Sequence, residues 1–196
     1  MMLVFLDFEA SSLGKRSYPI EVAWVFEDGT CETHLIRPAP GWDDWDPAAE
    51  AIHRIARATL LGDGEPHEAV ARRMLERLAG HDLRASAPSW DGKWLSTLLR
   101  AAGLPRHALR LGSSDAARHS AAGEILADRI AAEALDPTVD ALLARLEAPT
   151  GPPAHRALAD AQADRDRWLA VRAEARRIAA AVDQSDRAPD GQTPRA

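Results

Sequence analysis

The chain has 196 residues, of which 46% are hydrophobic and 28% are charged, and its formal net charge is −6. This composition indicates a folded protein with a sizeable core, and the negative charge argues against a broad electrostatic grip on long duplex nucleic acid. Because the sequence has no apolar run of membrane-spanning length, no signal-peptide pattern and a single cysteine, we expect a cytoplasmic protein without an internal disulfide or a cysteine-based zinc site.

Apolar patterning predicts three strands in the first part of the chain. They cover Leu3–Phe8, Tyr18–Glu27 and Thr30–Arg37, and Asp28-Gly29 is typical of a hairpin turn between the last two. We therefore expect an antiparallel three-strand meander.

The remainder alternates helical patterns with short strand patterns. We expect a short helix after Pro47, a helix over Pro66–Leu78, a strand over His81–Ala87, a helix over Trp90–Ala102, a strand over Arg106–Leu111, helices over Asp115–Leu135 and Thr138–Leu146, and a long helix over Ala157–Val182. This order predicts an α/β fold with a mixed five-stranded sheet and helices on both faces. We expect one domain over residues 1–183 and a disordered, polar tail over 184–196.

Two carboxylates follow the apolar part of the first strand. Because side chains alternate across a strand, Asp7 and Glu9 point to one side and Phe8 to the other. Two carboxylates this close repel each other and are poorly solvated beside a buried strand, and a Mg²⁺ or Mn²⁺ ion would relieve both effects. The alternative is that the strand has ended and both acids are solvated, and this stretch alone leaves the two open.

Two later segments carry further acidic candidates and a histidine. Asp91 opens a helix directly after a predicted strand, where an acid also interacts favourably with the helix dipole. His155 follows two prolines, and Asp160 lies in the first turns of the last helix. Since residues five apart do not share a helix face, these two converge only if His155 lies on a non-helical approach. An ordinary surface position is the alternative for each residue.

At these three places the chain resembles the DEDDh 3′–5′ exonucleases, which have an RNase H-like fold and include proofreading subunits and oligoribonucleases. Their first motif, D-x-E followed by small residues and leucine, is similar to Asp7–Leu13. Their second motif, an aromatic-Asp pair that opens a helix, is similar to Trp90-Asp91. Their third motif, H-x-A-x-x-D-A, is similar to His155–Ala161. The motifs occur in the family's order. The chain departs from the family in having Ala10 and Ser12 for the usual Thr and Gly, Trp for Phe in the second motif, and no upstream Asn there.

The resemblance implies an enzyme that hydrolyses single-stranded or short nucleic acid from a free 3′ end and releases nucleoside 5′-monophosphates. It implies two Mg²⁺ or Mn²⁺ ions, with Asp7 bridging both, Glu9 and Asp160 completing one ion's site, and Asp91 acting through a water. His155 would be the general base that takes a proton from the attacking water.

Several alternatives for the substrate and the activity stay open. RNA is slightly preferred over DNA here, because the net charge is negative and no basic domain is added. A DNA exonuclease, a non-catalytic RNase H-like binding module and an RNase H-type endonuclease are the other hypotheses. Relatives are often dimers, so a homodimer is also possible.

Candidate substrate contacts lie beside the motifs. The resemblance implies that the backbone at Ser11 and Ser12 meets the terminal 3′-hydroxyl and that Leu13 wedges against the last base, and a turn with a buried leucine is the alternative. We further expect three basic residues to contact phosphate, with solvated helix faces as the alternative. We also expect one tryptophan to stack on a base, with a half-buried core position as the alternative. They are Lys15, Lys93 and Arg156 for phosphate and Trp90 for stacking.

Overall fold

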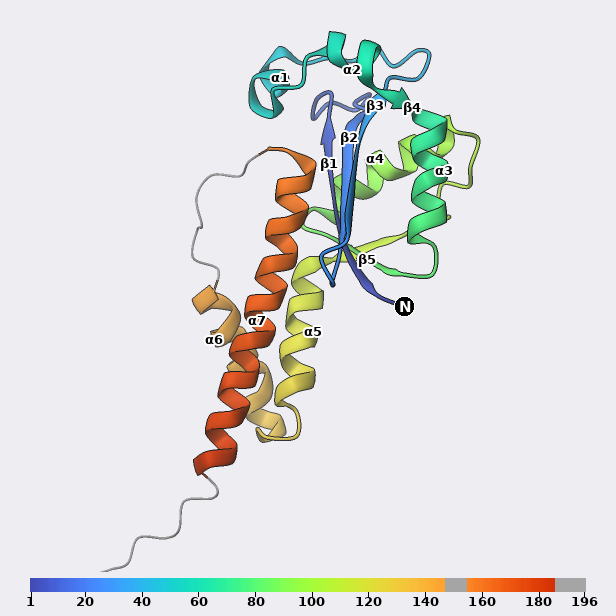
Figure 1. Cartoon of the computed structure of the whole chain (residues 1–196). Helices are drawn as coiled ribbons and strands as arrows, with labels where there is room; N and C mark the ends of the chain where they lie inside the picture. The colour runs from blue at the N-terminus through green and yellow to red at the C-terminus, as the bar shows by residue number, and fades with distance from the viewer. Residues whose placement is uncertain (147–154, 186–196) are drawn as a thin grey trace, which may run out of the picture. The chain divides into compact units, whose positions relative to one another are not determined.

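The computed structural model describes residues 1–146 and 155–185 (Figure 1). These residues form two compact units, one containing residues 1–117 and 155–166 and the other residues 118–146 and 167–185. The single domain expected over residues 1–183 stays a prediction. The predicted tail lies outside the described residues, apart from residues 184 and 185, which continue the last helix.

The first unit is built on a mixed sheet with the strand order β4-β3-β2-β1-β5-β6. The strands are β1 Leu3–Ala10, β2 Pro19–Phe26, β3 Cys31–Arg37, β4 Glu65–Pro66, β5 Asp82–Ala85 and β6 Leu111–Ser113. The pairs β1–β2 and β2–β3 are antiparallel, whereas β1–β5, β5–β6 and β3–β4 are parallel. The mixed sheet and its N-terminal meander are therefore confirmed.

In the described part of the chain the sheet has six strands rather than the five expected. The extra strand, β4, has only two residues, too few for an alternating pattern to indicate it. It can approach β3 because Gly64 has no side chain: a Cβ there would lie 2.8 Å from the backbone N of Arg37 and 2.3 Å from the carbonyl O of Leu60. The strand expected over Arg106–Leu111 is wrong in position, since residues 106–109 form turns and β6 begins only at residue 111.

The chain also forms seven helices among the described residues. They are α1 Pro47–His53, α2 Arg57–Asp63, α3 His67–Leu78, α4 Pro88–Ala101, α5 Ser114–Leu126, α6 Ala132–Leu146 and α7 Ala157–Ser185. The segment after Pro47 makes two helices instead of one, because Arg54 ends α1 in the left-handed conformation. The break expected before Thr138 is also wrong: it lies at residues 127–131, and Pro137 is inside α6, where it removes a single helical hydrogen bond.

Side chains alternate along β1, so Val4, Leu6 and Phe8 lie on one face of the sheet and Phe5, Asp7 and Glu9 on the other. Val4, Leu6 and Phe8 lie in a core that also contains the inward residues of α3 and α4, and Figure 1 shows both helices on the same side of β1–β3. Asp7 and Glu9 must then leave from the opposite face, where the first residue of α7 hydrogen-bonds to β2.

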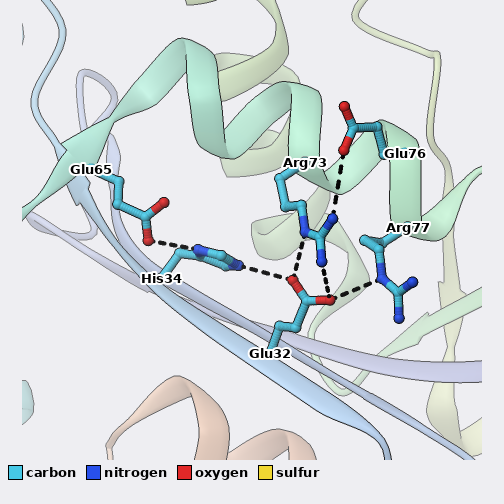
Figure 2. Close-up of polar contacts among 6 residues, drawn as sticks. All are labelled: Glu32, His34, Glu65, Arg73, Glu76 and Arg77. Carbon is cyan, nitrogen blue, oxygen red and sulfur yellow. Dashed lines mark hydrogen bonds and ion pairs between the residues drawn. The ribbon is translucent and has the colours of Figure 1, made fainter.

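An ion-pair network joins α3 to the outer strands (Figure 2). The Glu32 carboxylate on β3 accepts hydrogen bonds from Arg73 Nε at 2.8 Å, Arg73 Nη2 at 3.0 Å and Arg77 Nε at 2.9 Å. His34 Nδ1 lies 2.7 Å from Glu65 Oε1, which connects β3 to β4. These ion pairs hold α3 against β3.

The second unit has its own small core, to which α5, α6 and α7 all contribute. Its buried side chains are Ala122, Leu126, Val139, Leu142, Val171, Ala175 and Ala179. Within the described residues, no helix combines the length and the apolar character needed to cross a bilayer.

We expect Leu98→Ala to lower the free energy of unfolding by about 2–5 kcal/mol, because it leaves a cavity in a closely packed core. Leu98 is fully buried on α4, whereas Leu61 on α2 is 52% exposed and gives the matched control, Leu61→Ala. Urea denaturation followed by circular dichroism measures both variants. Equal losses would contradict the assignment of Leu98 to the core.

Candidate active site

Three carboxylates converge on the face of the sheet opposite α3 and α4. Asp7, Glu9 and Asp160 each offer an oxygen, and these oxygens lie within 4.8 Å of one another. The strand continues through both of the first two acids to Ala10, so the alternative in which it ends before them is wrong. Asp160 lies in the first turn of α7, so a strand and a helix end together build the cluster.

Asp91 adds a fourth carboxylate, and it lies in the first turn of α4 as predicted. The residue is only 2% exposed. Backbone N–H groups of Phe8 and Ala87 hydrogen-bond to its carboxylate, and Phe8 is the residue between the two acids of β1. Among the described residues, no donor reaches its Oδ2 atom. A buried oxygen without a donor is costly, and a cation or a cation-held water would satisfy it.

Burial and mutual repulsion raise the pKa of three of these acids. Burial first, and then the charges of Asp91 and Glu9, raise the pKa of Asp7 to about 9. Burial and the charge of Asp160 raise the pKa of Glu9 to about 7. Burial raises the pKa of Asp91 to about 7, although the two backbone N–H groups oppose the rise. The cluster thus holds protons that a divalent cation would displace, and its all-oxygen donor set suits Mg²⁺ or Mn²⁺.

His155 lies immediately before α7 and outside it, as predicted. Its φ is +50°, a left-handed conformation that costs a residue with a side chain about 1–2 kcal/mol. Such backbone strain persists only where the surrounding contacts enforce it. The imidazole is exposed and is not among the three convergent ligands, so its part in catalysis stays a prediction.

Arg156 is bound to a buried glutamate that sequence reasoning missed. Its Nε and Nη2 donate to the Glu21 carboxylate at 3.1 and 2.6 Å, and the N–H of Ala157 donates to the same carboxylate at 3.0 Å. Glu21 is 2% exposed. The signal in the sequence was a lone acid inside the otherwise apolar stretch of β2.

Lys93 is likewise engaged within the protein. Its Nζ donates to the carbonyl of Gly14 at 2.6 Å and to Ser17 Oγ at 2.8 Å, and Trp94 Nε1 donates to the same hydroxyl at 3.0 Å. The helix that carries Asp91 is therefore tied to the loop between β1 and β2. Trp90 is 39% exposed, and the Lys93 ammonium lies 5.1 Å from the centre of its ring.

The loop that follows the first motif uses its hydroxyl groups internally. Ser11 Oγ accepts from the N–H of Tyr18 at 3.1 Å. Ser12 Oγ donates to Asp44 and accepts from the N–H of Gly14. Leu13 is 71% exposed, which differs from the alternative of a buried leucine, and Lys15 is exposed as well.

Two further residues are buried in this region: Asp164 was not singled out from the sequence, and His53 was expected to be a surface residue. Asp164 is 4% exposed, accepts a hydrogen bond from Ser114, and contributes to the raised pKa of Asp7; its spacing of four residues from Asp160 was the available signal. His53 is 2% exposed, and its Nδ1 accepts from the N–H of Ile55 at 3.1 Å. Burial lowers its pKa, so the ring is neutral and its Nε2 carries the proton, without an acceptor in the described part of the chain.

The fold of this chain is similar to that of exonuclease I. The zinc-bound complex of Escherichia coli exonuclease I with single-stranded DNA has 18% sequence identity and a TM-score of 0.61, over 90% of this chain and 41% of that chain. The same enzyme with a dA16 oligonucleotide has 16% identity and a TM-score of 0.60, over 90% of this chain and 42% of that chain. Exonuclease I from Methylocaldum szegediense has 18% identity and a TM-score of 0.60, over 86% of this chain and 40% of that chain.

The chain has an exonuclease I-like fold. It spans less than half the length of these exonucleases. No family model and no curated protein matches the sequence. The mixed α/β, RNase H-like architecture expected from the three motifs is confirmed.

We expect the metal-free protein to lose stability as the pH rises from about 4 to about 9. Because the pKa of Asp7 is raised from 3.8 to about 9 by folding, the folded state binds this proton more tightly, and that stabilisation is lost as the pH rises through the folded pKa. Asp7→Asn removes the charge. In EDTA at pH 9 it should melt several degrees above the wild type, at roughly 2–4 °C per kcal/mol, and the two should converge near pH 4.

Asp43→Asn is the matched control, because this side chain is 68% exposed. Its melting temperature should follow the wild type at every pH. A constant difference between Asp7→Asn and the wild type across this range would contradict the raised pKa.

Proposed function

We propose that the protein is a metal-dependent 3′–5′ exonuclease of single-stranded nucleic acid. The observation that carries this proposal is the convergence of the Asp7, Glu9 and Asp160 oxygens within 4.8 Å. They lie on an exonuclease I-like fold and near the buried Asp91, whose Oδ2 has no hydrogen-bond donor among the described residues. A non-catalytic binding module has no need for four crowded acids, three of which (Asp7, Glu9 and Asp91) have a raised pKa.

The four acids fit two divalent cations, which we assign as Mg²⁺ or Mn²⁺. Asp7, Glu9 and Asp160 would hold them directly, with Asp7 shared between the two, and Asp91 would act through a water. When bound, the cations stabilise negative charge that develops on the phosphate during hydrolysis.

We assign His155 as the general base, because an imidazole accepts protons near neutral pH and this one is exposed next to the ligand-bearing helix. It would take a proton from the attacking water as the oxygen bonds to phosphorus, and the 3′ oxygen of the preceding nucleotide would leave. The products would be a nucleoside 5′-monophosphate and a strand one residue shorter.

We place single-stranded DNA first among the substrates, since neighbouring structures are complexes of exonuclease I with single-stranded DNA oligonucleotides. The preference for RNA stays a hypothesis, as do the homodimer and the cytoplasmic location. Leu13 and Trp90 are the exposed apolar groups available for bases, and the backbone at Ser11 and Ser12 would meet the 3′-hydroxyl. Lys15 is exposed and is the candidate phosphate contact, whereas Lys93 and Arg156 would act mainly by holding the site together.

We expect 5′-labelled single-stranded DNA to shorten from its 3′ end with Mn²⁺ or Mg²⁺ and to stay intact with EDTA. Matched RNA in parallel lanes ranks the two substrates, and Asp7→Asn should abolish cleavage because it removes the shared ligand. Saturating Mn²⁺ should also raise the melting temperature of the wild type, by an amount that corresponds to about 2.7 kcal/mol at 100 times the dissociation constant.

A circular single-stranded substrate separates this proposal from the endonuclease hypothesis, because an exonuclease requires an end. Cleavage of the circle at the rate of the linear strand would contradict the proposal. Intact strands in every lane together with no effect of Mn²⁺ on melting would favour the binding module.

We expect His155→Asn to lower turnover by about 10²–10⁴-fold, the usual contribution of a general base. Asparagine tolerates the left-handed backbone of residue 155, so this variant removes the base without disturbing the chain. The rise in melting temperature with Mn²⁺ should be unchanged. If both quantities fall together, His155 is a metal ligand instead.

A further inference from the structure

Glu21 lies beside the carboxylate cluster but belongs to a different strand. It pairs directly with Glu9 across β1 and β2, so the two side chains share one face of the sheet. A buried carboxylate next to another acid is unfavourable unless it is bonded, and Glu21 is bonded by Arg156 and Ala157.

These bonds fix the beginning of α7. The N–H of Asp160 donates to the carbonyl of Arg156 at 3.0 Å, which makes Arg156 the N-cap and Ala157 the first helical residue. The first N–H groups of a helix have no acceptor within the helix, and the Glu21 carboxylate supplies one from the sheet. Its negative charge is also favourable at a helix N-terminus.

The bonded residues 156 and 157 lie between the two functional residues of this segment, His155 and Asp160. His155 precedes the bonded pair of residues 156 and 157 and has a left-handed φ of +50°. Asp160 follows the pair by one helical turn. One buried carboxylate therefore holds the chain between the proposed base and a proposed metal ligand.

We propose that Glu21 is a positioning residue that holds the start of α7, and with it His155 and Asp160, against the acids of β1. This inference rests on the proposed function for its catalytic consequence, but the contact itself has a separate test. It also reassigns Arg156 from a phosphate contact to the partner of Glu21.

We expect Glu21→Met, which keeps the side chain's size and removes its bonds, to lower kcat by about 10–100-fold, the usual effect of losing a group that orients ligands. KM should stay within about threefold, because Glu21 is buried and its carboxylate is bonded to Arg156 and Ala157. Glu21→Gln keeps an acceptor for Ala157 and should recover part of the loss. In the double variant with Arg156→Gln, Glu21→Met should cause little further loss, since the two side chains act as one unit.

Glu32→Gln is the matched control. It weakens the contact of Glu32 on β3 with Arg73 and Arg77 on α3 (Figure 2), and it should lower the melting temperature while leaving kcat unchanged. If Glu21→Met lowers only the melting temperature, as Glu32→Gln does, Glu21 is merely structural and the proposal is wrong.

Amide hydrogen exchange at Ala157 tests the contact without any assay of activity. Protection there reports the Glu21 carboxylate, because this N–H has no acceptor within the helix. Exchange should be at least about tenfold faster in Glu21→Met than in the wild type, even if the wild type cleaves no substrate and the proposed function fails. Equal exchange rates in the two proteins would overturn the inference.

Discussion

Repulsion among carboxylates on one face of β1 is the constraint on which the first unit depends. One face of the strand is apolar, with Leu6 and Phe8 in the core beneath α3 and α4, and on the other face Asp7 and Glu9 follow the buried Phe5. The core stabilises the strand strongly enough to keep both acids half-buried. Their raised pKa values are the electrostatic cost of that placement, and a cation is the natural counterpart that lowers it.

The N-terminal ends of two helices also reduce the electrostatic cost of burying acids together. Asp91 and Asp160 both lie in the first turns of their helices, α4 and α7, where free N–H groups and the helix dipole favour negative charge. The acidic residues are therefore supplied by the places in the fold that tolerate them best. Glu21 repeats this arrangement, because its charge lies at the start of α7 although it comes from β2.

Sequence reasoning located the acids because a strand and a helix beginning impose short-range rules. The period of two along β1 placed Asp7 with Glu9, and the prolines before His155 placed it outside the helix. It failed where the outcome depends on partners distant in sequence. Lys93 and Arg156 lie next to the motifs, yet their charges are bonded to Gly14 and Glu21, and no local pattern indicates such pairings. Likewise β4 forms only because β3 is available beside Gly64.

The short strand β4 also affects how the protein behaves at high concentration. It forms the outer border of the sheet, it has only two residues, and the second is Pro66, which has no N–H to offer. An exposed border with a long row of free backbone groups invites a foreign strand to add to it. On β4 this row is cut short by a proline and by the start of α3, so β4 itself is a poor template for strand addition, and it covers the outer side of β3 only at Ile36 and Arg37.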